Sequence, residues 1–155
     1  MSIIGSMKTN KIEKALSCFK KGFNCSQSTF SAYDKELGLC RKTMFKVSGA
    51  FGGGMARMGE TCGAVSGAFM VIGCRYGQIK PNDKDAKENT YRITKEFMDE
   101  FKKRNRSILC KDLLGYDIST PEGAAIVKEK NFHETLCPKF IQDAIEILDK
   151  VLAKN

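Results

Sequence analysis

The segment from Cys62 to Gly77, CGAVSGAFMVIGCRYG, carries no charged side chain before Arg75. A helix that is apolar on every side is buried in a protein rather than laid on its surface. Its small residues let neighbouring backbones approach closely, although each glycine costs roughly 1 kcal/mol of helix propensity. The segment therefore predicts a buried, glycine-rich central helix. Its β-branched residues are also compatible with a buried strand, but the sequence has no second strand that could form a hairpin with it.

The rest of the sequence shows helical periodicity on both sides of that segment, with N-caps at Asn24 and Thr120. Helical segments are expected at residues 9–21, 25–38, 41–51, 82–105 and 119–130 and after Pro138. No linker, internal repeat or low-complexity stretch interrupts them. We therefore predict an all-α, single-domain helical bundle over residues 9–155. Residues 1–8 are interpreted as an N-terminal tail, whose start before Met7 could come from an expression vector.

The composition narrows the classes of protein that fit. The chain has 155 residues, enough for one domain with a substantial core. No apolar run reaches the roughly 18 residues that cross a membrane, and the N-terminus lacks a signal-peptide core. We therefore expect a cytoplasmic protein without membrane insertion. The net charge of +8 favours anionic partners, but the bases are scattered and no nucleic-acid-binding motif is present, so nucleic acid is not an expected partner.

Seven cysteines are many for a protein expected in a reducing compartment, where structural disulfides are rare. No two of them form a C-x-x-C pair, so zinc ribbons, thioredoxin-like motifs and covalent c-type haem lack their signatures. One group shares a local context, at or next to a predicted helix N-terminus: Cys25, Cys62, Cys110 and Cys137. The remaining cysteines are interpreted as small packing residues: Cys18, Cys40 and Cys74.

The shared context of the first group has a chemical consequence. A helix N-terminus presents unpaired N–H groups and a partial positive charge, both of which stabilise a thiolate. A cysteine there is expected to have a depressed pKa, and the thiolate is the form that attacks disulfides and binds metals. If the helices converge, the four thiolates share one site. The alternative is four inert packing residues, and the repetition of one context favours the shared site.

The glycines beside Cys62 allow several interpretations. The run FGGGM is not a Walker loop, because no G-K-[ST] follows and no strand precedes it. Glycine tolerates positive φ and close approach, so the run is interpreted as backbone freedom beside the cysteine. With two glycines of the central helix, these positions are the candidate cofactor-binding residues: Gly52, Gly53, Gly54, Gly63 and Gly67.

Two further polar residues near the cysteines have ordinary interpretations. His133 lies four residues before Cys137, but Pro138 indicates that a new helix begins there, so the two residues do not share one continuous helix. We therefore interpret His133 as a solvated or capping side chain rather than a metal ligand. Glu60 is interpreted as a carboxylate at a helix start, in preference to a proton carrier for a neighbouring thiol.

Several of these features occur together in one known family. FNCSQS, FGGGM, C-G-A-V-S-G and two later single cysteines resemble the C_GCAxxG_C_C family of redox-active proteins, over roughly residues 11–152. The family label writes G-C-A where this chain has C-G-A. The family pattern falls on Cys25, Cys62, Gly63, Ala64, Gly67, Cys110 and Cys137.

The resemblance implies redox activity carried by the four cysteines. The family is also similar to the non-haem part of split-Soret cytochromes, where an iron–sulfur centre is suspected. This chain has no C-x-x-C-H motif, so no covalent haem is expected on it.

Three functions stay open. The cysteines could bind an iron–sulfur cluster, iron or zinc, for electron transfer in the redox cases. The protein could instead be a thiol–disulfide oxidoreductase, with Cys62 as nucleophile and Cys25 as the other candidate catalytic cysteine. It could also be a helical module that binds a ligand or partner and whose cysteines are structural. The expected partner is a redox protein or a small thiol or disulfide; enzymatic activity and a homodimer stay open.

Overall fold

The computed structural model describes residues 3–155, with side chains from Asn10 onward. Within that range all regular elements are helical, apart from an isolated bridge between Thr61 and Leu109. The fold is therefore all-α, as the sequence predicts. The elements are α1 (Ile3–Lys20), α2 (Cys25–Ser31), α3 (Asp34–Leu37), α4 (Arg41–Ser48), the 3₁₀ helix η1 (Gly49–Phe51), α5 (Gly63–Tyr76), α6 (Lys84–Asn105), α7 (Cys110–Leu114), α8 (Pro121–Glu129), α9 (Phe132–Thr135) and α10 (Cys137–Lys154).

The helix boundaries differ from the expected ones mainly in two places. The segment expected as one helix at 25–38 is divided into α2 and α3, and Gly38 ends α3 with a left-handed φ of +63°. α1 begins at Ile3, earlier than residue 9. The first two residues of the expected tail, 1–8, lie outside the described residues. No helix in the described part of the chain is long and apolar enough to cross a membrane.

α5 is the buried central helix that the sequence predicts. Most of its first three turns are buried, and it packs against α2, α6 and α10. Gly67 permits the approach of α2, because a Cβ built there would lie 2.9 Å from the carbonyl oxygen of Ser26 and 3.0 Å from Cβ of Thr29. This close packing compensates for the low helix propensity of glycine.

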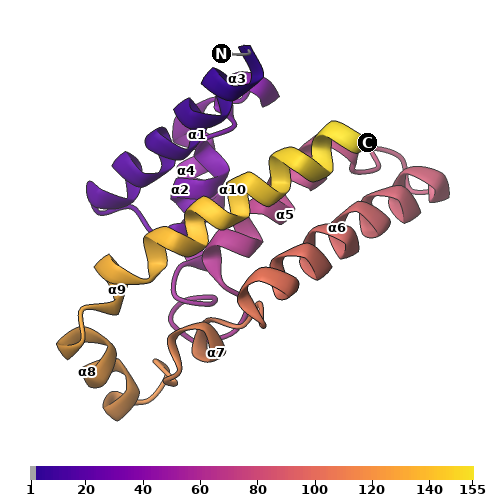
Figure 1. Ribbon diagram of the computed structural model, residues 1–155. Coiled ribbons are helices and arrows are strands. Elements are labelled where there is room, and N and C mark those ends of the chain that lie inside the picture. The colour runs from indigo at the N-terminus through magenta and orange to yellow at the C-terminus, as the bar shows by residue number, and fades with distance from the viewer. Residues whose placement is uncertain (1–2) are drawn as a thin grey trace.

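The long helices lie side by side around that centre. Figure 1 shows α10 crossing the bundle between α1 and α6, and α10 packs against both. The apolar stripe of α10 is buried along its length. The short helices α7, α8 and α9 gather at one end of the bundle, where α10 begins (Figure 1).

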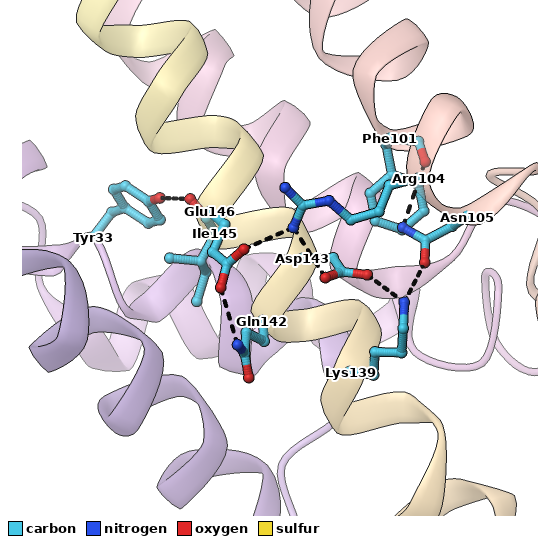
Figure 2. A network of polar contacts seen from close by, with 9 residues as sticks. All are labelled: Tyr33, Phe101, Arg104, Asn105, Lys139, Gln142, Asp143, Ile145 and Glu146. Atoms are coloured by element: carbon cyan, nitrogen blue, oxygen red, sulfur yellow. Dashed lines mark hydrogen bonds and ion pairs between the residues drawn. The ribbon is translucent and has the colours of Figure 1, made fainter.

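A polar network fixes α6 to α10 (Figure 2). Asp143 on α10 is buried, with 7% of its surface exposed. Its carboxylate accepts hydrogen bonds from Arg104 at 3.1 Å and from Lys139 at 2.6 Å. Arg104 also donates to Glu146 at 2.7 Å, and Lys139 donates to Asn105 at 2.8 Å. The two cations compensate the buried carboxylate and hold the two helices together.

Candidate four-cysteine site

The four cysteines expected at helix starts come from four separate helices. Cys25, Cys110 and Cys137 are the first residues of α2, α7 and α10, and Cys62 is the N-cap of α5. The prediction that each lies at or next to a helix N-terminus is confirmed. All four line one cavity of about 760 Å³. The fold therefore brings together residues that are far apart in the sequence.

The other three cysteines do not line this cavity. Cys18 is buried in α1, and its sulfur lies 3.9 Å from the hydroxyl of Ser31, so the packing interpretation fits it. Cys74 is exposed near the end of α5, so the packing interpretation is wrong for it, as it is for the exposed Cys40. Cys40 is the N-cap of α4. The sequence contains a signal for this position, because Cys40 directly precedes the helix expected at 41–51.

A capping box at the start of α2 positions Cys25. The side-chain oxygen of Asn24 accepts the backbone N–H of Gln27 at 2.9 Å, and the Gln27 side chain accepts the backbone N–H of Asn24 at 3.0 Å. Nδ2 of Asn24 also donates to the carbonyl of Gly49 at 2.9 Å. The cap predicted at Asn24 is thus confirmed, and it ties α2 to the segment before the glycines.

Two glycines make room for two of the cysteines. A Cβ built on Gly63 would lie 2.2 Å from Sγ of Cys25. A Cβ built on Gly54 would lie 2.7 Å from Cβ of Cys110 and 2.6 Å from the backbone nitrogen of Glu60. No larger residue fits at either position while the cysteines keep their places.

Only some of the glycines predicted to bind a cofactor line the cavity. Gly52 and Gly53 line the cavity itself. Gly54 and Gly63 lie behind it, each against a cysteine. Gly67 packs against the backbone of α2 and does not line the cavity, so its place in the structure is explained by helix packing.

The loop between these glycines and Cys62 has an uncommon backbone. Its residues from Gly53 to Arg57 all have left-handed φ, including the non-glycine residues Met55 (+62°), Ala56 (+50°) and Arg57 (+64°). Left-handed φ costs a non-glycine residue about 1–2 kcal/mol. This turn is not predictable from the sequence, because these three residue types give no signal for it.

Backbone hydrogen bonds join this loop to the start of α7. The N–H of Cys62 donates to the carbonyl of Ile108 at 2.7 Å, and the N–H of Cys110 donates to the carbonyl of Glu60 at 2.6 Å. The Glu60 side chain is exposed and lies 3.6 Å from the amine of Lys111. These bonds fix Cys62 and Cys110 relative to each other, and Glu60 contributes through its backbone.

His133 lies at the wall of the cavity. Its ring stacks on Phe19 with centroids 4.4 Å apart, and its side chain is exposed. The solvated side chain that we expected is the one observed, although its position on the cavity was not expected.

Burial controls the acidity of the cavity thiols. Burial raises the pKa of Cys62 well above its usual value, and the nearby charges of Cys25, Cys110 and Cys137 raise it further. Burial also raises the pKa of Cys110 and of Cys137 to about 12. The expected pKa depression at the helix N-termini is therefore wrong for these cysteines, because loss of hydration outweighs the helix terminus.

Cys25 shows the two effects in opposition. Burial raises the pKa of its thiol, while hydrogen bonds from the backbone N–H groups of Gly53, Ser26, Gly63 and Cys25 itself lower it. The net direction is upward. These N–H groups are placed to stabilise a sulfur that carries negative charge, as a metal-bound thiolate does.

A family comparison bears on this site. The family model described as "Putative redox-active protein (C_GCAxxG_C_C)" matches residues 23–151. The chain belongs to this family. No curated protein and no solved structure matches the chain.

In this C_GCAxxG_C_C protein the four cysteines that the sequence pattern picks out are those that line the cavity. The match begins just before the α2 cap and ends within α10, so it includes every element that contributes one of them. Among the residues that the structure describes, no three His, Cys, Asp or Glu side chains are arranged to hold a single metal ion.

Proposed function

We propose that this protein is an electron carrier whose four cysteines bind an iron–sulfur cluster. The observation that carries the proposal is the convergence of cysteines from four helices on one cavity. Four cysteine thiolates are the usual ligands of such a cluster, which supplies electron-transfer chemistry when bound. The ligands would be Cys25, Cys62, Cys110 and Cys137.

The size and lining of the cavity support a cluster over a single ion. A single zinc ion needs each sulfur at about 2.3 Å, so its ligands crowd around one point. In the described part of the chain no such compact group is present, whereas all four cysteines line a cavity of about 760 Å³. A cluster places its ligands around several metal ions and therefore tolerates wider spacing.

The protein's own groups would act on the sulfurs. The backbone N–H groups around Cys25 would stabilise negative charge on that sulfur. Cys62 and Cys110 are 6% and 8% exposed, so water has little access to their sides of the site. Hydrogen bonds to the sulfurs and solvent exposure are the main means by which a protein sets the reduction potential of a cluster.

Anaerobic purification of the full chain tests this proposal. We expect a coloured protein with visible charge-transfer absorption, and iron and acid-labile sulfide in similar amounts. A colourless protein free of metal, with all four cavity thiols titratable, would overturn it. Zinc without sulfide would replace the cluster by a redox-inert site.

A second function, thiol–disulfide exchange, is supported by the proximity of Cys25 to Cys62. The Cys25 charge is the largest side-chain influence on the pKa of Cys62, after burial itself, and the Cys25 sulfur lies against Gly63. Cys62 would attack a partner disulfide as its thiolate, the minor form at neutral pH because burial raises its pKa. Cys25 would then break the mixed disulfide, which leaves the partner reduced and a Cys25–Cys62 disulfide in this protein.

Redox titration with mass mapping of the cysteines separates this function from the first. The oxidoreductase function requires a reversible Cys25–Cys62 disulfide within the physiological range of potentials. Absence of that disulfide across the whole range removes the second function and leaves the first.

A further inference from the structure

The cavity has more surface than the four cysteines account for. Its volume of about 760 Å³ lies within the range of roughly 300–1,000 Å³ that is usual for small-molecule sites. Its lining includes apolar side chains from α7, α8, α10 and the α7–α8 connection. We call the following residues the apolar wall: Leu113, Leu114, Ile118, Val127 and Phe140.

The apolar wall is partly open to solvent. Leu113, Ile118 and Val127 are half-buried, although their side chains are aliphatic. Figure 1 shows α7 and α8 at one end of the bundle, with α7 just beyond the end of α6. Aliphatic surface that faces a cavity is a common feature of sites that take the apolar body of a ligand.

Apart from the cysteines and His133, the titratable side chains that line the cavity are all cationic. Arg57 and Lys128 line the cavity, and no described Asp or Glu does. Within the described residues neither cation has a hydrogen bond or ion pair through its side chain. The two come from different elements, the left-handed loop and α8. The lining therefore includes two solvent-exposed cations and, among the described residues, no carboxylate.

The position of Arg57 is maintained against backbone strain. Its φ is +64°, and it follows two other non-glycine residues with left-handed φ. The turn is closed by a hydrogen bond from the N–H of Arg57 to the carbonyl of Gly52 at 3.1 Å. A Cβ on Gly53 would lie 3.0 Å from Cα of Arg57, so the turn is also tightly packed. Strain of this kind is typically retained at functional positions.

We propose that this cavity binds a small organic anion, a carboxylate or phosphate ester with an apolar body. The guanidinium of Arg57 matches two oxygens of such a group, and Lys128 adds a second positive charge. The apolar body lies along the apolar wall. This site goes beyond the proposed electron carrier, because it gives the protein a small-molecule ligand next to its cysteines.

Calorimetric titration of the full chain, purified anaerobically, tests the site. The probes are benzoate and phenyl phosphate, with benzamide as a neutral analogue and inorganic phosphate as an anion without an apolar body. We expect at least one of the two organic anions to bind about tenfold or more tightly than benzamide, and phenyl phosphate to bind more tightly than inorganic phosphate. The stronger of benzoate and phenyl phosphate identifies the preferred acid group.

Two double variants with equal loss of charge give the control. R57Q/K128Q should weaken binding of the preferred anion about tenfold or more, whereas K80Q/K84Q, on exposed lysines outside the cavity, should leave it within about twofold. Equal losses in both variants would overturn the proposal, because they would indicate attraction by net charge alone. Binding of benzamide as tight as that of both anions, or of inorganic phosphate as tight as phenyl phosphate, would overturn it as well.

Iron and sulfide assays on the same samples keep the two proposals separate. Both double variants should retain the wild-type iron content, since neither changes a cysteine. A wild-type protein that binds the anion without iron would overturn the cluster and support the anion site. A protein with full iron content that binds none of the probes would do the reverse.

Discussion

Gly63 and Gly73 lie in the same helix, α5, but have different surroundings. A Cβ built on Gly63 would lie 2.2 Å from the sulfur of Cys25, whereas nothing lies within 4 Å of one built on Gly73. A change to alanine raises helix propensity by about 1 kcal/mol in a helix interior, where Gly73 lies, whereas Gly63 is the first residue of α5. We predict that G73A raises the free energy of unfolding by up to about 1 kcal/mol and that G63A lowers it by about 1–3 kcal/mol. Denaturant unfolding measures both, and a G63A protein as stable as wild type would contradict the packing described.

Cys40 and Cys74 are both exposed but should differ in reactivity. Hydrogen bonds from the backbone N–H groups of Thr43 and Lys42 lower the pKa of Cys40, whereas partial burial of the thiol raises the pKa of Cys74. A lower pKa gives a larger thiolate fraction at neutral pH, and the thiolate is the reactive form. We predict that iodoacetamide modifies Cys40 several-fold faster than Cys74 at pH 7. The difference should narrow as the pH rises past about 8.5, the usual thiol pKa.

Time-resolved peptide mass mapping follows the two cysteines in one sample. C40S serves as the control, since it should remove the fast phase and leave the modification of Cys74 unchanged. Equal rates at pH 7 would show that the helix start does not activate Cys40.

At the scale of secondary-structure elements, the caps of α2 and α6 can be compared, because both are side-chain N-caps and only the α2 cap lies beside a cavity cysteine. Asn24 caps α2 beside Cys25, and Asp83 caps α6 by accepting the N–H of Ala86 at 3.0 Å, away from the cavity. Loss of an N-cap side chain costs about 1 kcal/mol, so N24A and D83A should each lower the free energy of unfolding by about that amount. Only N24A should also lower the iron content per chain, because only that cap positions a cysteine. Similar iron contents in the two variants would show that the α2 cap does not position a ligand of the site.

The placement of cysteines at helix starts could be predicted because it depends on local sequence. Asn24 marks the start of α2 directly before Cys25, and Pro138 marks the start of α10 directly after Cys137. The sequence predicts a shared site for the four cysteines only if their helices converge. Convergence depends on packing between elements, which the local sequence does not specify.

The acidity of the cysteines could not be predicted from the same local signals. Cys40 and Cys62 are both N-cap residues, of α4 and α5. The pKa of Cys40 is lowered, but burial raises the pKa of Cys62. The difference is the burial of Cys62 under other elements, which arises only in the assembled fold. The left-handed turn at Met55, Ala56 and Arg57 was missed for a related reason, since its surroundings impose it.

At the scale of the whole molecule, a group bound to all four cysteines would link α2, α5, α7 and α10. A ligand that binds only the folded state stabilises it by mass action, by about 4 kcal/mol at a thousandfold excess over its dissociation constant. We predict that removing the iron of the proposed cluster with a chelator lowers the free energy of unfolding by several kcal/mol. Thermal and denaturant unfolding before and after chelation measure the change.

A variant with all four cavity cysteines replaced by serine is the control for that experiment. It should not respond to the chelator, because it has no site for iron. Unfolding curves of the wild-type protein that coincide before and after iron removal would mean that the bound metal does not connect the helices.

The central claim, that the four cavity cysteines form one site, is tested most directly by the iron content per chain of the seven single cysteine-to-serine variants. We predict that C25S, C62S, C110S and C137S each retain less than half of the wild-type iron, since each removes a ligand of one shared centre. C18S, C40S and C74S should retain all of it. Full iron content in any of the first four variants, or equal loss across all seven, would contradict a shared four-cysteine site.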